Sequence, residues 1–117
     1  MVFYFSETNC WDCIEAALNQ IKNIPDSIKL NNYLILCNYS NVRYFQAFIK
    51  DIDLKVPIYN NEEKLNIPLE NMDVPFFFII NSDLHCKQVF IPIKEIENYT
   101  ANYLQAMNKK YWSKTIN

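Results

Sequence analysis

The stretch VFYFSETNCWDC, residues 2–13, joins an apolar run to two cysteines that lie three positions apart. The run Val2–Phe5 is typical of a short strand. Apolar residues then recur at helical spacing, at Ile14, Ala17, Leu18 and Ile21. Cys10 and Cys13 are therefore predicted to lie on the first turn of a helix that directly follows a strand.

Cysteines at this spacing and in this position can form a redox pair. Two thiols one helical turn apart can close a disulfide with little backbone movement, and the N–H groups at a helix start lower the pKa of the nearest thiol by stabilising its thiolate. We expect Cys10 to be the exposed nucleophile and Cys13 to be the more buried partner that resolves its mixed disulfides.

The two residues between the cysteines should modify the pair. Asp12 should raise the pKa of the Cys10 thiol by like-charge repulsion between the carboxylate and the thiolate. Trp11 should lie at the rim of the site. There it either packs against a substrate or folds over the start of the helix.

Composition limits the classes of protein to consider. The chain has 117 residues, of which half are apolar and 15% are aromatic, and this predicts one packed domain over residues 1–117. The net charge of -2, without a basic patch, argues against nucleic acid as a partner. No apolar run is long enough to span a bilayer, and no signal peptide is visible before Val2. We expect a monomer with no direct membrane span.

Strands and helices alternate along the rest of the chain. Continuous apolar runs at Tyr33–Cys37 and Phe76–Ile80 predict strands that are covered on both faces. The other predicted elements are a helix over residues 42–52, an extended piece at Val56–Tyr59, a turn at Ser82–His85, a strand at Cys86–Ile91, and a final helix that is entered at Pro92 and carries Ile96, Tyr99, Tyr103 and Met107. This order predicts a mixed sheet with helices on both faces. Glycine is absent, so we expect Asn, Asp, Ser or Pro to make every turn.

Two stretches resemble the thioredoxin fold, and within that superfamily they are most similar to the TlpA-type thiol–disulfide oxidoreductases of bacterial envelopes. The first is FYFSETNCWDC, residues 3–13, which matches a strand, a short loop, a redox pair and a helix. The second is DVPFFFIINSD, residues 73–83, which matches a Val-Pro strand that ends in an acidic turn. The resemblance implies a thioredoxin-like, three-layer α/β fold, with a central mixed sheet of four to five strands flanked by helices.

The resemblance also implies a function and its site residues. Cys10 and Cys13 would exchange a disulfide with protein disulfide or dithiol substrates. The electrons would come from a partner thiol, without a bound cofactor or metal. Val74, Pro75 and Phe76 would lie beside the pair, with a cis bond before Pro75 and the backbone of Val74 available to pair with an extended substrate. The compartment would be the periplasm or cell envelope, with the cytoplasm as the alternative.

One expected group is replaced in this sequence. Thioredoxins carry a buried acid six residues before the first cysteine, and the residue at that position here is Tyr4. Glu7 is the nearest carboxylate on the preceding loop, so it is the candidate to modulate the pair.

Three other interpretations remain open. A zinc site would need further ligands from Cys37, or from His85 with Cys86, and the sequence has no second Cys-x-x-Cys. A peroxiredoxin-like peroxidase would carry Thr three residues before its reactive cysteine, where this chain has Glu7. A non-catalytic thioredoxin-fold binding module would hold a structural disulfide at the same two cysteines.

Overall fold

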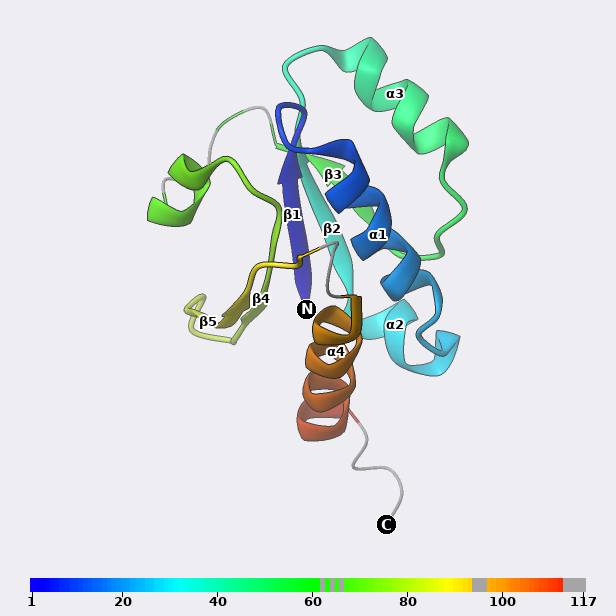
Figure 1. Cartoon of the computed structure of the whole chain (residues 1–117), viewed down its shortest axis with the longest axis vertical. Helices are drawn as coiled ribbons and strands as arrows, with labels where there is room; N and C mark the ends of the chain where they lie inside the picture. The colour runs from blue at the N-terminus through cyan, green and yellow to red at the C-terminus, as the bar shows by residue number, and fades with distance from the viewer. Residues whose placement is uncertain (62, 64, 66, 94–96, 113–117) are drawn as a thin grey trace.

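The computed structural model describes residues 1–61, 63, 65, 67–93 and 97–112. Its elements, labelled in Figure 1, are β1 (Val2–Ser6), α1 (Trp11–Lys22), α2 (Asp26–Asn32), β2 (Leu34–Asn38), α3 (Val42–Asp51), β3 (Ile58–Asn60), the 3-10 helix η1 (Pro68–Met72), β4 (Phe76–Ile80), β5 (Cys86–Phe90) and α4 (Glu97–Trp112). The strands form one sheet in the order β3-β2-β1-β4-β5.

β1 is the central strand of this sheet. It runs parallel to β2 and antiparallel to β4, while β3 pairs in parallel with β2 and β5 pairs antiparallel with β4. The predicted mixed α/β sheet of four to five strands is therefore confirmed. The extended piece expected at Val56–Tyr59 contributes to the edge strand β3.

α1 and α3 cover the same face of the sheet. The chain moves from β1 to β2 to β3 in one direction, and right-handed connections then place both intervening helices on one side. The contacts agree with this topology, because Phe5 of β1 belongs to the same buried cluster as Ile14 of α1 and Phe48 of α3. Leu104 of α4 joins the same cluster, so α4 also packs on this side.

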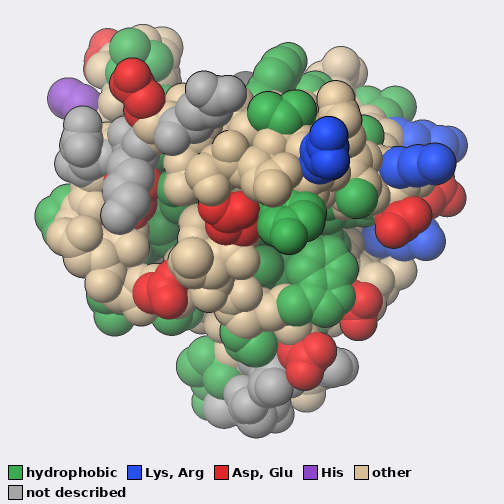
Figure 2. Space-filling view, turned by 90° about the horizontal axis from the view of Figure 1, so that it is seen from above, with side chains coloured by type: hydrophobic (Ala, Val, Ile, Leu, Met, Phe, Trp, Pro, Cys, Tyr) green, Lys and Arg blue, Asp and Glu red, His purple; other side chains and the backbone are tan. Residues whose placement is uncertain are grey.

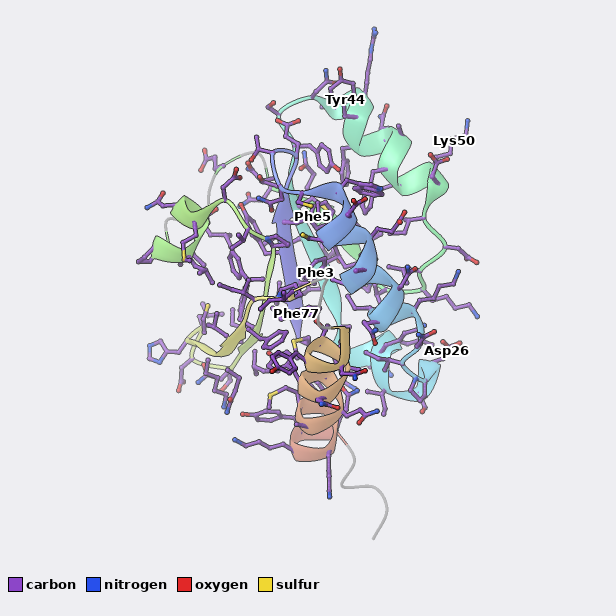
Figure 3. The ribbon with its side chains drawn as sticks, viewed as in Figure 1. Phe3, Phe5, Asp26, Tyr44, Lys50 and Phe77 are labelled. Carbon is purple, nitrogen blue, oxygen red and sulfur yellow. The ribbon has the colours of Figure 1, made fainter. Side chains whose placement is uncertain are left out.

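The central strand is buried on both of its faces. Phe3 and Phe5 point toward the helices, and in Figure 3 they lie with Phe77 at the centre of the molecule. Val2 and Tyr4 point to the opposite face, where they form a second apolar cluster. Because both faces of β1 are buried, its sequence is a continuous apolar run and not an alternation of apolar and polar residues.

The second face is covered differently from the prediction. Its cluster contains Tyr4, Phe76 and Phe78, and the residues packed against them include Ile67 and Leu69 from the segment around η1. A 3-10 helix and its flanking chain therefore occupy the place where the predicted three-layer arrangement has α-helix.

Helix α2 was not predicted from the sequence. It has only seven residues, and their apolar pattern is weak. Its position is fixed by Lys29, which is 95% buried and whose Nζ donates a hydrogen bond of 2.9 Å to the carbonyl oxygen of Lys22 at the end of α1. Asp26, 3.4 Å from the same ammonium group, supplies its counter-charge. Such tertiary contacts override local propensity.

The final helix agrees with the prediction over its described length. Tyr103 stacks on Phe90 of β5 with ring centroids 4.5 Å apart, and Leu104 is buried. The predicted entry at Pro92 cannot be traced through to the helix, because residues 94–96, including Ile96, lie outside the described residues.

The turns are only partly made as predicted. Asp73 adopts a left-handed conformation at φ 53°, as expected for an Asp in a chain without glycine. Leu84, in the β4–β5 turn, has φ 63°, and Gln88, at the irregular β4–β5 pairing, has φ 56°. The expectation that only Asn, Asp, Ser or Pro make the turns is therefore wrong at Leu84.

Leu84→Gly should stabilise the protein. Leu84 is 76% exposed, so little packing is lost, and glycine removes the steric cost of a Cβ in the left-handed region. We expect the free energy of unfolding in urea to rise by about 1 kcal/mol. Leu84→Ala is the control, since it keeps the Cβ. Equal stabilities of the glycine and alanine variants would contradict the assignment of strain to this position.

Candidate functional site

Cys10 lies at the junction of β1 and α1. A tight turn follows the strand. In this turn the backbone N–H of Asn9 donates to the Ser6 carbonyl at 3.0 Å, and the backbone N–H of Ser6 donates to Asn9 Oδ1 at 2.8 Å. Cys10 follows as the N-cap residue of α1, with φ -59° and ψ 119°, and its carbonyl accepts from the Ile14 N–H at 3.1 Å. Its side chain is exposed, next to the N–H groups of the first helical turn.

Cys13 lies within the first turn of α1 and is half-buried. The two cysteines approach each other to 3.1 Å, and both are present as thiols. Cys13 also lines a small cavity with Pro92 and Thr100, from the segment that leads into α4 and from α4 itself. The pair therefore consists of an outer thiol open to solvent and an inner thiol against the body of the protein, as the sequence predicts.

The Asp-Val-Pro segment, residues 73–75, lies beside the turn that precedes Cys10. Asp73 directly precedes Val74, and its Oδ1 accepts hydrogen bonds from Thr8 Oγ1 at 2.6 Å and from Asn9 Nδ2 at 3.0 Å. Val74 and Asn9 line the same polar cavity of about 140 Å³. Two segments more than sixty residues apart are thus joined immediately before Cys10.

Glu70, in η1, ties the chain just before η1 to strand β1. Its Oε2 accepts from the Tyr4 hydroxyl at 2.6 Å and from the Leu65 N–H at 2.9 Å, while its Oε1 accepts from the Ile67 N–H at 3.3 Å. Burial, together with the hydrogen bond and the charge of Glu70, raises the pKa of Tyr4. Tyr4 therefore stays protonated and serves as a donor. It does not replace the buried acid that the family resemblance leads one to expect at this position.

Sequence reasoning missed Thr8, Asn9, Glu70 and Asp73 as residues that position the site. One signal could have found Asp73, because in a chain without glycine an Asp directly before Val-Pro is a candidate for the left-handed conformation. The long-range partners of its carboxylate have no signal in the sequence.

The structure directs the Glu7 carboxylate toward the β2–α3 loop. Its Oε1 accepts from the Ser40 N–H at 3.1 Å and from the Ser40 hydroxyl at 2.5 Å. These hydrogen bonds lower the pKa of Glu7, which is fully exposed. Asp12 is exposed on the first turn of α1, where a carboxylate interacts favourably with the helix N-terminus. Its effect on Cys10 stays a prediction.

Trp11 packs against α3 and remains half-exposed, so its contact with a substrate stays a prediction. Its ring meets Phe48 of α3 edge-on, with centroids 6.1 Å apart, yet 49% of the residue is exposed. The indole is therefore held partly against α3, and about half of the residue is accessible directly after Cys10.

The proline segment differs from the expectation in two ways. The described residues contain no cis peptide bond, so the predicted cis bond before Pro75 is wrong, and the bond has the trans form that X-Pro bonds ordinarily prefer. Phe76 is fully buried on the sheet face opposite α1, against Tyr4 with ring centroids 5.0 Å apart. This burial argues against Phe76 as a substrate contact. Val74 remains half-buried beside the polar cavity.

The other potential sulfur and nitrogen ligands lie elsewhere. Cys37 is fully buried in β2, and burial raises the pKa of its thiol to about 12. His85 and Cys86 are exposed in the β4–β5 hairpin. Within the described part of the chain, no three His, Cys, Asp or Glu side chains are grouped as a metal site requires.

Among the described helices, none combines the length and the apolar character needed to cross a bilayer. Comparisons of the chain with protein-family models, curated proteins and solved structures gave no match. Function must therefore be inferred from the residues and their arrangement.

Asp73→Ala should loosen the junction between the two motifs. The change removes the acceptor of two hydrogen bonds and leaves alanine at φ 53°, so we expect the free energy of unfolding to fall by about 2 kcal/mol. Amide hydrogen exchange at Thr8, Asn9 and Cys10 should accelerate. Asp73→Asn keeps an Oδ1 acceptor, so its free energy of unfolding should fall by less.

The matched control is Asp83→Ala, which removes an exposed carboxylate from the β4–β5 turn. If Asp73→Ala and Asp83→Ala proved equally stable and equally protected at residues 8–10, Asp73 would not be holding the site.

Proposed function

We propose that this protein is a thiol–disulfide oxidoreductase of the thioredoxin-like, TlpA-like kind. The observation that carries the proposal is the 3.1 Å approach of Cys10 and Cys13 at the N-terminus of α1, with Cys10 exposed and Cys13 half-buried. A helix N-terminus stabilises a thiolate, and the thiolate is the form that attacks disulfides.

The reaction would proceed in two exchanges. The Cys10 thiolate attacks one sulfur of a substrate disulfide, so that a Cys10–substrate bond forms and the other substrate sulfur leaves as a thiolate, which takes up a proton. Cys13, after losing its proton, attacks the Cys10 sulfur and releases the second substrate thiol. Two electrons and two protons pass from the pair to the substrate, and the Cys10–Cys13 disulfide remains. Two thiols of an electron donor then reduce this disulfide and themselves become a disulfide, and the reverse sequence oxidises a substrate dithiol.

The surroundings suit a polypeptide substrate. The exposed part of Trp11 offers an apolar contact directly after Cys10. Val74, which the Asp73 hydrogen bonds hold next to Asn9, could pair through its backbone with an extended substrate segment. Pro75 follows and is buried, and its ring restricts the backbone φ angle there.

The same resemblance favours the periplasm or cell envelope as the compartment, with protein disulfides or dithiols as substrates and a thiol as electron donor. The main rival is a non-catalytic binding module of the same fold, whose Cys10–Cys13 disulfide would be structural. A binding module of this kind would not turn over a disulfide substrate.

Reduction of insulin by dithiothreitol tests the proposal. The wild-type protein should accelerate the precipitation of insulin chains, and Cys10→Ser should return the rate to that of dithiothreitol alone, because the attacking thiolate is gone. Cys86→Ser removes an exposed cysteine outside the site and is the matched control, which should behave as wild type. Equal turnover by wild type and Cys10→Ser, or no acceleration by wild type, would refute the assignment.

A further inference from the structure

A groove of about 560 Å³ lies between α1 and α3. Its apolar lining includes Trp11 and Leu18 from α1, Phe48 from α3, and Leu54 from the segment after α3. Trp11 directly follows Cys10, so the groove reaches the residue next to the exposed thiol. Figure 1 shows α3 standing at the upper end of the molecule, alongside the start of α1.

The groove is both apolar and accessible. Trp11 is 49% exposed and Tyr44, at the α3 side, is 64% exposed. Large apolar side chains that line a groove and remain half-exposed favour association with another apolar surface, because covering them removes that surface from water.

The rim of the groove is acidic. Glu7, Glu15, Asp51 and Asp53 line it, and the cation among its lining residues is Lys22. The hydrogen bonds from Ser40 lower the pKa of Glu7. Lys50 of α3 does not line the groove, and in Figure 3 it points away from the body of the molecule. Figure 2, which looks down on this end, shows Asp and Glu side chains among hydrophobic ones, with Lys and Arg side chains also present on this face.

We propose that this groove receives a basic, apolar segment of the substrate protein, and this inference rests on the oxidoreductase function proposed above. The segment would place a large apolar side chain in the groove and Lys or Arg against the acidic rim, while its cysteine meets Cys10. The acidic side chains of the groove attract Lys or Arg and repel an acidic segment, and its apolar lining accepts a large apolar side chain. Substrate choice would therefore be set by α3 as well as by the residues around the cysteines.

Peptide disulfides can test this preference. Each peptide carries one cysteine in a mixed disulfide with thionitrobenzoate and one nearby phenylalanine, and the peptides differ in having lysines or glutamates at the flanking positions. The reduced protein gives up two electrons and becomes the Cys10–Cys13 disulfide, and the products are one peptide thiol and one coloured thionitrobenzoate. Second-order rate constants for release are measured in low and high salt.

The lysine peptide should react about tenfold faster than the glutamate peptide in low salt, and the ratio should approach one in high salt. The double variant Asp51→Lys/Asp53→Lys should abolish or invert this ratio of rate constants, because it reverses the charge of the groove rim at the α3 side. Glu63→Lys/Asp83→Lys makes the same change in net charge at exposed positions outside the groove and should keep the wild-type ratio. Replacing the phenylalanine of the lysine peptide with serine should slow its reaction several-fold.

The outcomes separate the two proposals. Release by the wild type that is no faster than release by Cys10→Ser, for every peptide, would overturn the oxidoreductase function itself. Cys10-dependent release with equal rates for the lysine and glutamate peptides would leave that function intact and overturn the groove proposal. An equal loss of the ratio in both charge-reversal variants would also overturn it, because the preference would then follow net charge.

Discussion

The burial of β1 on both faces is the constraint on which the site depends. Phe3 and Phe5 pack toward the helices, and Val2 and Tyr4 pack toward the η1 side, so the strand cannot shift by one residue without turning its side chains to the wrong faces. Its end at Ser6 is thereby fixed, and a short turn carries the chain to Cys10. The position of the exposed thiol thus follows from the packing of a strand that has no part in the chemistry.

Long-range polar contacts complete what the core begins. Asp73, held in a left-handed conformation, bonds to the turn before Cys10, and Glu70 bonds to Tyr4 and to the backbone before η1. These carboxylates join the chain before β4 to β1 and to the turn that follows it. The site is therefore built where two chain segments meet, and its geometry depends on hydrogen bonds as well as on the helix start.

The sequence predicted the features that local patterns control. Apolar runs located the central strands, and helical spacing placed Cys10 and Cys13 at the start of α1, where the structure has Cys10 as the N-cap and Cys13 in the first turn. The prediction failed where tertiary contacts decide. It missed α2, which the buried Lys29 holds, and it expected α-helix on both faces of the sheet, whereas the segment around η1 covers the second face. The buried position of Phe76 depends on which face of β4 each residue takes, and a fully apolar run does not reveal this.

Equilibration with glutathione tests the central claim most directly. The protein is held at graded ratios of reduced to oxidised glutathione, the remaining thiols are alkylated, and each cysteine is assigned by peptide mass. Cys10 and Cys13 should pass together between dithiol and disulfide in a two-electron transition, while Cys37, with its pKa raised to about 12 by burial, stays a thiol. If Cys10 and Cys13 never formed a mutual disulfide, or only gained glutathione separately, the account would be contradicted.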